Sequence, residues 1–215
     1  MADKEPIRWI TVHGAHVPIY ENGYAEDYKP DDESNHEWMN KTFISKHEAL
    51  NTIESDIRNQ SYETGVCISQ RGKVIFSQDG DMHGVEFTDE QYKKLEGNIL
   101  THNHPSSSCF SEHDLYIFAN YGLLEMRAIG ANGKGCSISL TNITPQKHPS
   151  TIGDDYRKAV SGYEKTEIKE YYANSEYDEV TTIKNINKMI DKYRRSWLKA
   201  NAATYGFQYK EFKGV

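Results

Sequence analysis

Two histidines one residue apart, His102 and His104, follow a short apolar run and directly precede Pro105. Residues two apart on a β-strand point to the same face of the sheet, so both imidazoles can approach one point. Proline cannot donate a hydrogen bond to a neighbouring strand, which ends such a strand at Pro105. The pattern therefore predicts a buried strand that delivers two nitrogen ligands to a single place.

A helix is predicted at 112–121, directly after a small polar loop. Its apolar residues, Leu115 and Phe118 among them, recur at helical spacing, and Ser111 with Asp114 three residues later is a capping-box arrangement. The carboxylate of Asp114 is thus expected at the first turn of the helix, close to the two histidines. Two nitrogens and one oxygen from rigid elements, with one coordination position open, are the ligand set of a catalytic zinc ion.

Hydrolysis at such a site also needs a carboxylate that does not bind the metal, and a donor for the oxyanion. Glu63 is the preferred base because it enters an apolar strand, where a carboxylate needs a reason to be present. Ser111, about one helical turn before the aspartate, is the candidate oxyanion donor. The remaining candidate bases lie on an amphipathic helix, where acids are usually solvated, or in turns and helix ends: Glu48, Glu54, Glu86 and Glu96.

The order of predicted elements indicates an α/β fold with a mixed central β-sheet flanked by helices. These elements are a hairpin at 7–19, an exposed loop at 21–40, a helix at 46–59, strands at 62–69 and 73–76, a short helix at 89–96, the histidine strand, its following helix, and a hairpin at 126–140. We expect an N-terminal hairpin and acidic loop (1–45), a core (46–145) and a helical C-terminal extension (146–215).

The C-terminal extension is predicted to hold helices at about 151–174 and 182–204. The second has an apolar stripe of Ile183, Ile186, Ile190, Tyr193 and Trp197, wide enough to dock on the core or on a partner protein at 183–215. Phe207, Tyr209 and Phe212 follow the end of this helix, and no helix or strand is predicted for them.

Charge and composition limit the partners and the compartment. Residues 1–183 carry 17 basic and 30 acidic groups, a balance of −13, whereas from residue 184 onward eight basic residues meet two acidic ones, a balance of +6. The acidic body disfavours nucleic acid, and the basic end could meet an anionic partner or simply be solvated.

No apolar run approaches the ~18 residues that span a membrane. Three widely spaced cysteines and no secretory signal favour the cytoplasm.

The ordered set Glu63-Thr-Gly-Val, His102-Asn-His104-Pro and Ser111-x-x-Asp114 resembles the signature of the JAB/MPN (JAMM) metalloprotease family over roughly residues 46–142. The resemblance implies a cytidine deaminase-like fold, a Zn²⁺ ion held by the two histidines and the aspartate, the glutamate as general acid/base, and the serine as oxyanion donor. Nine residues separate the second histidine from the aspartate, one fewer than is usual in the family. The sequence His102-Asn-His-Pro-Ser is similar to the corresponding motif of prokaryotic and phage members of the family, including RadC-like ones.

We therefore expect a zinc-dependent hydrolase that cleaves peptide or isopeptide bonds, with a protein or peptide substrate, ubiquitin-like proteins included, in a bacterial or phage-infected cell. The alternative is a non-catalytic JAB-fold binding or phage assembly module that acts through its helical C-terminal region. A thiol nucleophile at Cys109 near His113 is disfavoured because no orienting acid is identifiable, and that histidine is expected to be exposed. His13 and His16 are interpreted as turn or surface residues.

Overall fold

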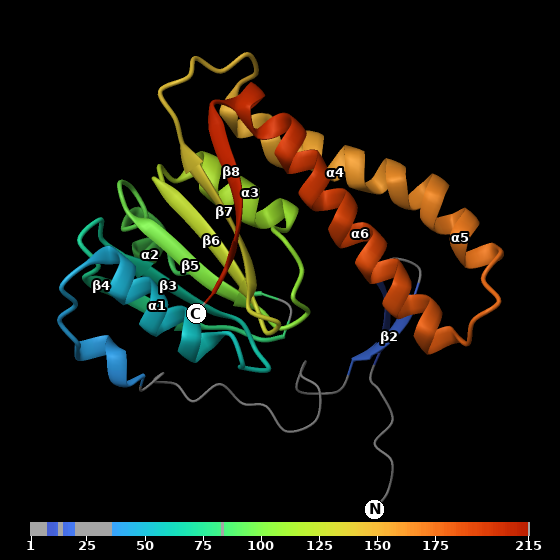
Figure 1. The fold of residues 1–215 in the computed structure, drawn as a ribbon, viewed down its shortest axis with the longest axis horizontal. Helices are drawn as coiled ribbons and strands as arrows, with labels where there is room; N and C mark the ends of the chain where they lie inside the picture. Colours follow the sequence, from blue (N-terminus) through green and yellow to red (C-terminus); the bar gives the residue numbers. More distant parts are fainter. Residues whose placement is uncertain (1–7, 13–14, 20–35, 83, 215) are drawn as a thin grey trace, which may run out of the picture.

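The computed structural model describes residues 8–12, 15–19, 36–82 and 84–214, with side chains from residue 36 onward (Figure 1). The strands are β1 (Arg8–Val12), β2 (Ala15–Ile19), β3 (Thr64–Ile68), β4 (Val74–Asp79), β5 (Ile99–His104), β6 (Glu125–Gly130), β7 (Lys134–Leu140) and β8 (Phe207–Lys213). The α-helices are α1 (Lys46–Ile57), α2 (Asp89–Lys93), α3 (Glu112–Asn120), α4 (Ile152–Tyr163), α5 (Lys169–Ala173) and α6 (Glu179–Asn201). Shorter helical turns are η1 (Glu37–Asn40), η2 (Pro149–Thr151), η4 (Ala202–Tyr205) and the π-helical η3 (Glu164–Ile168).

A mixed sheet of six strands, in the order β4-β3-β5-β6-β7-β8, forms the centre of the molecule. Only β5 and β6 run parallel, and α3 connects them, because parallel neighbours need a crossover. The other neighbours in this sheet pair antiparallel, and β1 and β2 form a separate hairpin. The expected α/β class, mixed sheet and flanking helices are therefore confirmed, as is the hairpin at 7–19.

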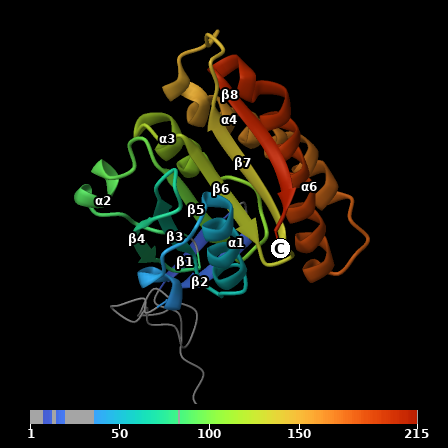
Figure 2. The same cartoon turned by 60° about the vertical axis from the view of Figure 1, so that its left-hand side comes forward.

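Strand alternation divides the buried side chains between the two faces of the sheet. On one face, Val66 and Ile99 pack with α1. On the other, Cys67 and Leu100 join a larger cluster that includes residues of α3, α4 and α6. Figure 2 shows α1 and α6 on different sides of the sheet. On β5, His102 and His104 lie two and four residues after Leu100, so their side chains point to the same face of the sheet as Leu100, the face that α3 covers.

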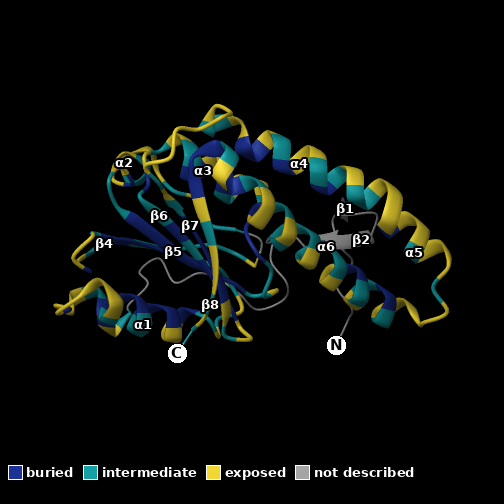
Figure 3. Cartoon of the chain, turned by 45° about the horizontal axis from the view of Figure 1, so that its top comes forward, coloured by how far each residue is buried: buried dark blue, intermediate teal, exposed yellow. Residues whose placement is uncertain are grey.

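Helices α4 and α6 pack against each other and extend beyond the sheet (Figure 3). The predicted stripe on α6 faces inward: Ile190 is buried, Tyr193 stacks on Tyr163 with ring centroids 4.3 Å apart, and Trp197 lies edge-on to Tyr156 at 5.3 Å. The helical region therefore shares the main hydrophobic core with the strands.

The chain after α6 forms a strand that the sequence interpretation missed. Gly206 adopts a left-handed conformation (φ 80°) that ends the helical turn η4, as glycine readily does. Phe207 to Lys213 then pair antiparallel with β7 along its whole length. The expectation that Phe207, Tyr209 and Phe212 merely trail behind the helix was wrong, although their partial alternation with polar residues was a strand signal.

The expected exposed loop at 21–40 is only partly testable, since residues 21–35 lie outside the described residues, as does His13. Within its last part, η1 buries Trp38, which is 3% exposed and donates from Nε1 to Asp56 Oδ2 at 2.9 Å. The prediction of a loop was therefore wrong for 37–40, and the prediction of exposure was wrong for Trp38, because the indole needs burial and a partner for its N–H, whereas Glu37 and Asn40 are exposed.

None of the helices in the described ranges is long and apolar enough to cross a lipid bilayer.

Candidate metal centre

His102 and His104 converge as the strand pattern predicted. Both lie on β5 and are buried, 5% and 4% exposed, and their Nε2 atoms are 2.9 Å apart. Pro105 follows directly and the strand ends before it. Two imidazole nitrogens this close are repulsive as bare lone pairs, so the arrangement requires a proton or a cation between them.

Asp114 completes the group. Its Oδ1 lies 3.3 Å from His102 Nε2 and its Oδ2 3.5 Å from His104 Nε2. Together the three side chains form a group of metal-ligating type, with one donor atom from each lying within 4.8 Å of the others. Two buried nitrogens and one partly buried carboxylate oxygen that converge are suited to a zinc ion that keeps an open position.

The start of α3 fixes the aspartate. Ser111 caps the helix: its Oγ accepts from the Asp114 N–H at 3.1 Å, and its own N–H donates to Asp114 Oδ2 at 2.6 Å. The capping box predicted from the sequence is therefore confirmed. The same carboxylate that stabilises the helix start points at the imidazoles, so one residue serves both purposes.

The electrostatics of the group favour a positive charge at its centre. Burial raises the pKa of Asp114, but the two imidazoles outweigh it and hold that pKa well below its usual range. Burial lowers the pKa of His104, and Asp114 and Glu63 more than compensate, raising it to about 9. A buried carboxylate beside two imidazoles thus holds its negative charge, which is the condition for binding a cation.

The loop after the histidines orients the second ring. His104 Nδ1 lies 3.1 Å from the carbonyl oxygen of Ser108, so an N–H there leaves Nε2 as the free donor atom. Ser107 is at φ 59°, an uncommon conformation for a residue with a side chain, and lies against Gly130. A Cβ at that glycine would come within 2.7 Å of Ser107 Cα. The sequence interpretation missed these contacts, and the three successive serines were the available signal.

Glu63 lies immediately before β3 and reaches the histidines. Its Oε1 is 3.8 Å from His104 Nε2, and its side chain is 14% exposed. Burial raises the pKa of Glu63, and the two imidazoles offset this only in part. The Glu63 carboxylate therefore lies beside the group and outside the set of three.

The other candidate bases lie elsewhere. Glu54 was expected to be solvated, but it is 4% exposed and accepts from Arg127 Nε at 2.6 Å and Thr101 Oγ1 at 3.0 Å. Glu48 accepts from the backbone of Ile44 on the surface of α1. Glu86 and Glu96 are exposed. Among the described glutamates, only Glu63 forms a contact within 4.0 Å with either histidine of the group.

Ser111 has a second contact that bears on its predicted role as oxyanion donor. Its Oγ donates to Asp114 Oδ2 at 2.7 Å. A hydroxyl has one proton, so this bond must be released before the serine can donate to a substrate oxyanion. The serine lies at the group, and its role there stays a prediction.

The thiol alternative has little support in the structure. Cys109 is fully buried, with its Sγ 3.0 Å from Cys136 Sγ, so it presents no surface to a substrate. His113 is exposed and lies beside Tyr116, as expected. The side chain of His16 lies outside the described residues.

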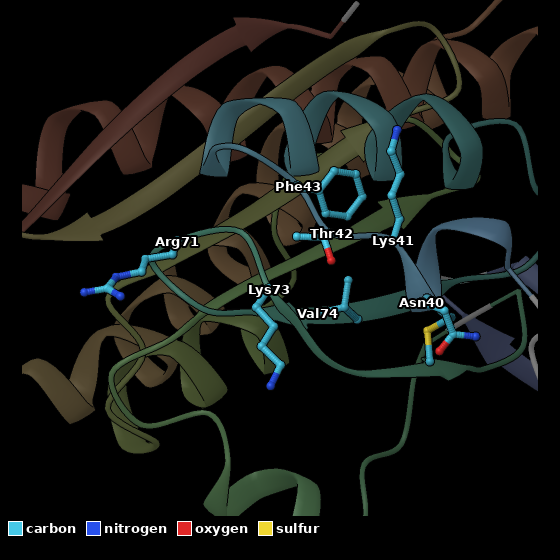
Figure 4. Close-up of a pocket in the computed structure, with 8 residues that line it drawn as sticks. Asn40, Lys41, Thr42, Phe43, Arg71, Lys73 and Val74 are labelled. Atoms are coloured by element: carbon cyan, nitrogen blue, oxygen red, sulfur yellow. The ribbon is translucent and has the colours of Figure 1, made fainter.

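A separate pocket of about 400 Å³ lies between residues 39–43 and the turn from β3 to β4 (Figure 4). None of its lining residues belongs to the histidine–aspartate group. In Figure 4 the side chains of Lys41, Arg71 and Lys73 point in different directions. They therefore do not form a convergent anion site.

Comparison of the chain with protein families, with curated proteins and with solved structures gives no match.

Proposed function

We propose that this protein is a zinc-dependent hydrolase of JAB/MPN (JAMM) type that cleaves peptide or isopeptide bonds. One observation carries the proposal: donor atoms of the buried His102 and His104 and of the partly buried Asp114 converge, and the carboxylate of Glu63 lies 3.8 Å from the second histidine. Three ligands and an independent carboxylate are the minimum set for metal-assisted hydrolysis.

The roles follow from the contacts. A zinc ion bound by the two histidines and Asp114 would lower the pKa of a water molecule to ~7 and polarise the substrate carbonyl. Glu63 accepts the proton of the attacking water and passes it to the leaving amine. Ser111 stands at the start of α3, where its hydroxyl can donate to the oxyanion once the bond to Asp114 is released.

The substrate class rests on the resemblance to prokaryotic and phage JAB/MPN proteins rather than on a substrate groove. Ubiquitin-like fusions, linear peptides and isopeptide-linked conjugates are therefore all members of the panel to be tested. The type of bond that is cleaved is decided by that panel.

The decisive experiment compares metal content and cleavage in purified wild-type protein and in Glu63→Gln. We expect both proteins to hold one zinc ion by mass spectrometry of the metal, and Glu63→Gln to lose cleavage by ~10²–10⁴-fold, the usual contribution of general acid–base catalysis. Glu90→Gln, an exposed glutamate on α2, is the matched control and should match the wild type. Normal cleavage by Glu63→Gln would refute the assignment of the base.

The binding-module alternative loses one of the two observations that motivated it, the apolar stripe on α6, whereas the basic balance of the C-terminal region remains. The apolar stripe on α6 is used inside the molecule, where Tyr193 and Trp197 pack on α4. The exposed residues of α6 include the lysines Lys184, Lys188 and Lys192, and a charged helix face is usually just solvated. Truncation after residue 177 would also remove β8 from the sheet, so point variants on the helix surface are the proper test of a partner.

A further inference from the structure

Asn103 stands between the two histidines on β5, and its side chain is directed at the segment that carries Glu63. The residue is fully buried. Its Oδ1 accepts from the backbone N–H of Thr64 at 2.7 Å, and its Nδ2 donates to the carbonyl of Tyr62 at 2.7 Å. The two bonded residues are the immediate neighbours of Glu63 on either side.

The side-chain amide continues the sheet where the backbone ladder stops. The pairing of β3 with β5 ends at Gly65, opposite His102. In an extended chain, the C=O of one residue and the N–H two residues later point to the same neighbouring strand. The carboxamide of Asn103 takes up that pair of groups, one acceptor and one donor, as a peptide group of a neighbouring strand would.

The opposite side of the same segment is also held. The Glu63 N–H donates to the carbonyl of Asp81 at 2.8 Å, and the Glu63 carbonyl accepts from the Gly80 N–H at 2.8 Å. Four hydrogen bonds therefore hold the segment 62–64: two join Glu63 itself to the turn after β4, and two join its neighbours Tyr62 and Thr64 to Asn103. An extended residue at this position has the parity of Cys67, and so it faces the histidine side of the sheet.

We propose that Asn103 is a positioning residue that holds the backbone around Glu63 and thereby sets the position of its carboxylate relative to His102 and His104. The catalytic consequence rests on the proposed function, whereas the placement of Glu63 does not. One residue on β5 thus couples the metal-binding strand to the segment that supplies the base. A misplacement of about 1 Å in a catalytic group can cost ~10²-fold in rate.

The competing explanation is that Asn103 is only a satisfied buried amide that stabilises the sheet. Thr101 provides the matched control, because it lies two residues earlier on β5, points to the same face and makes one buried hydrogen bond, to Glu54. Thr101→Val removes a buried polar contact without touching the neighbours of Glu63. A purely structural role predicts similar behaviour for Asn103→Ala and Thr101→Val.

The experiment uses full-length protein with zinc and measures metal content, kcat and KM on the best substrate of the panel, amide hydrogen exchange at residues 62–64, and crystal structures. For Asn103→Ala we expect wild-type zinc content, kcat lowered ~10–100-fold with KM little changed, faster exchange at Thr64, and a displaced Glu63 carboxylate. Thr101→Val should keep kcat and the Glu63 position even where its thermal stability falls.

The conservative variant Asn103→Asp keeps the acceptor for Thr64 and loses the donor to Tyr62, so we expect an intermediate kcat. It takes the place of Asn103→Ala if that protein does not fold. A wild-type kcat in both Asn103→Ala and Asn103→Asp would overturn the proposal. It would also be overturned if kcat fell only in proportion to lost zinc, and to the same extent in the Asn103 variants and in Thr101→Val. If the wild-type protein cleaves nothing, the proposed hydrolase fails, and a crystal structure of the Asn103 variant with the Glu63 carboxylate unmoved would overturn the positioning role as well.

Discussion

Arg127 on β6 and the buried Glu54 on α1 form a largely buried ion pair, with the guanidinium Nε 2.6 Å and Nη2 3.1 Å from the two carboxylate oxygens. The guanidinium carbon also lies 3.9 Å from the centre of the Phe212 ring on β8. By strand alternation Arg127 shares the parity of Ile129, so this pair lies on the α1 face, opposite the histidines. It joins three elements that are far apart in the sequence.

Replacing Arg127 with Met should therefore destabilise the protein without emptying the metal centre. Loss of one partner leaves the Glu54 charge buried and unpaired, which typically costs about 3–5 kcal/mol. The free energy of unfolding from urea titrations measures the loss, and zinc content should stay at the wild-type level. The double variant Glu54→Gln/Arg127→Met should recover part of the loss, since no lone charge remains. Equal stabilities of the single and double variants would contradict this account.

Zinc should stabilise the folded protein through the histidine–aspartate group. At a free zinc concentration 100 times the dissociation constant, a site present only in the folded state contributes about 2.7 kcal/mol. Thermal unfolding with zinc and with a chelator should therefore differ clearly for the wild type. In Asp114→Asn, which keeps an acceptor for the helix cap but loses the charge, the two curves should nearly coincide. A zinc-dependent shift of wild-type size in that variant would remove Asp114 from the ligand set.

His36 should make stability depend on pH near neutrality. Asp79, the main cause, and Asp56 raise the pKa of His36, and Asp56 Oδ2 lies 2.8 Å from its Nδ1. Because the pKa of His36 is higher in the folded than in the unfolded protein, its protonation stabilises the folded state. This stabilisation is fully present at a pH below the unfolded pKa of about 6.5, and it is lost as the pH rises through the pKa of the folded state. The difference in unfolding free energy between the wild type and His36→Gln, measured without metal from pH 5.5 to 9, should shrink as pH rises. A difference independent of pH would mean that the ring contributes only by stacking on Trp38, at 4.5 Å.

The C-terminal helix should unfold together with the sheet. Leu198 on α6 is fully buried in the cluster that also contains Leu100 and Met126. Leu198→Ala should lower the free energy of unfolding by about 2–5 kcal/mol, as large-to-small changes in cores do. Its exposed neighbour Lys199→Ala is the control and should change little. Separate transitions by helix-sensitive and tryptophan signals would show that the helices form an independent unit.

Local patterns were sufficient to predict several elements and the meeting of the site residues. The period of two on β5 placed His102 and His104 on one face, and the capping box placed Asp114 at the start of α3. Both depend on contacts a few residues apart, which the order of residue types determines. Glu63 was chosen because a carboxylate at the mouth of an apolar strand needs a reason, and it does lie beside His104.

The wrong predictions concern residues whose partners are distant in the sequence. Glu54 has the position of a solvated helix residue, but its partner Arg127 is 73 residues away. Phe207 to Lys213 form a strand only because β7 offers an edge to pair with. Trp38 is buried by contact with α1, which local polarity does not indicate.

The sequence by itself determined the chemistry available at the centre of this protein: two imidazoles, a capped aspartate and a strand-borne glutamate, each fixed by short-range spacing. Only the tertiary structure decided how Glu63 is held. The amide of Asn103 reaches across from β5 to both neighbours of Glu63, a contact between residues about 40 positions apart. Spacing along one strand orients its own side chains, but the distance between two strands is set by the hydrogen bonds that join them.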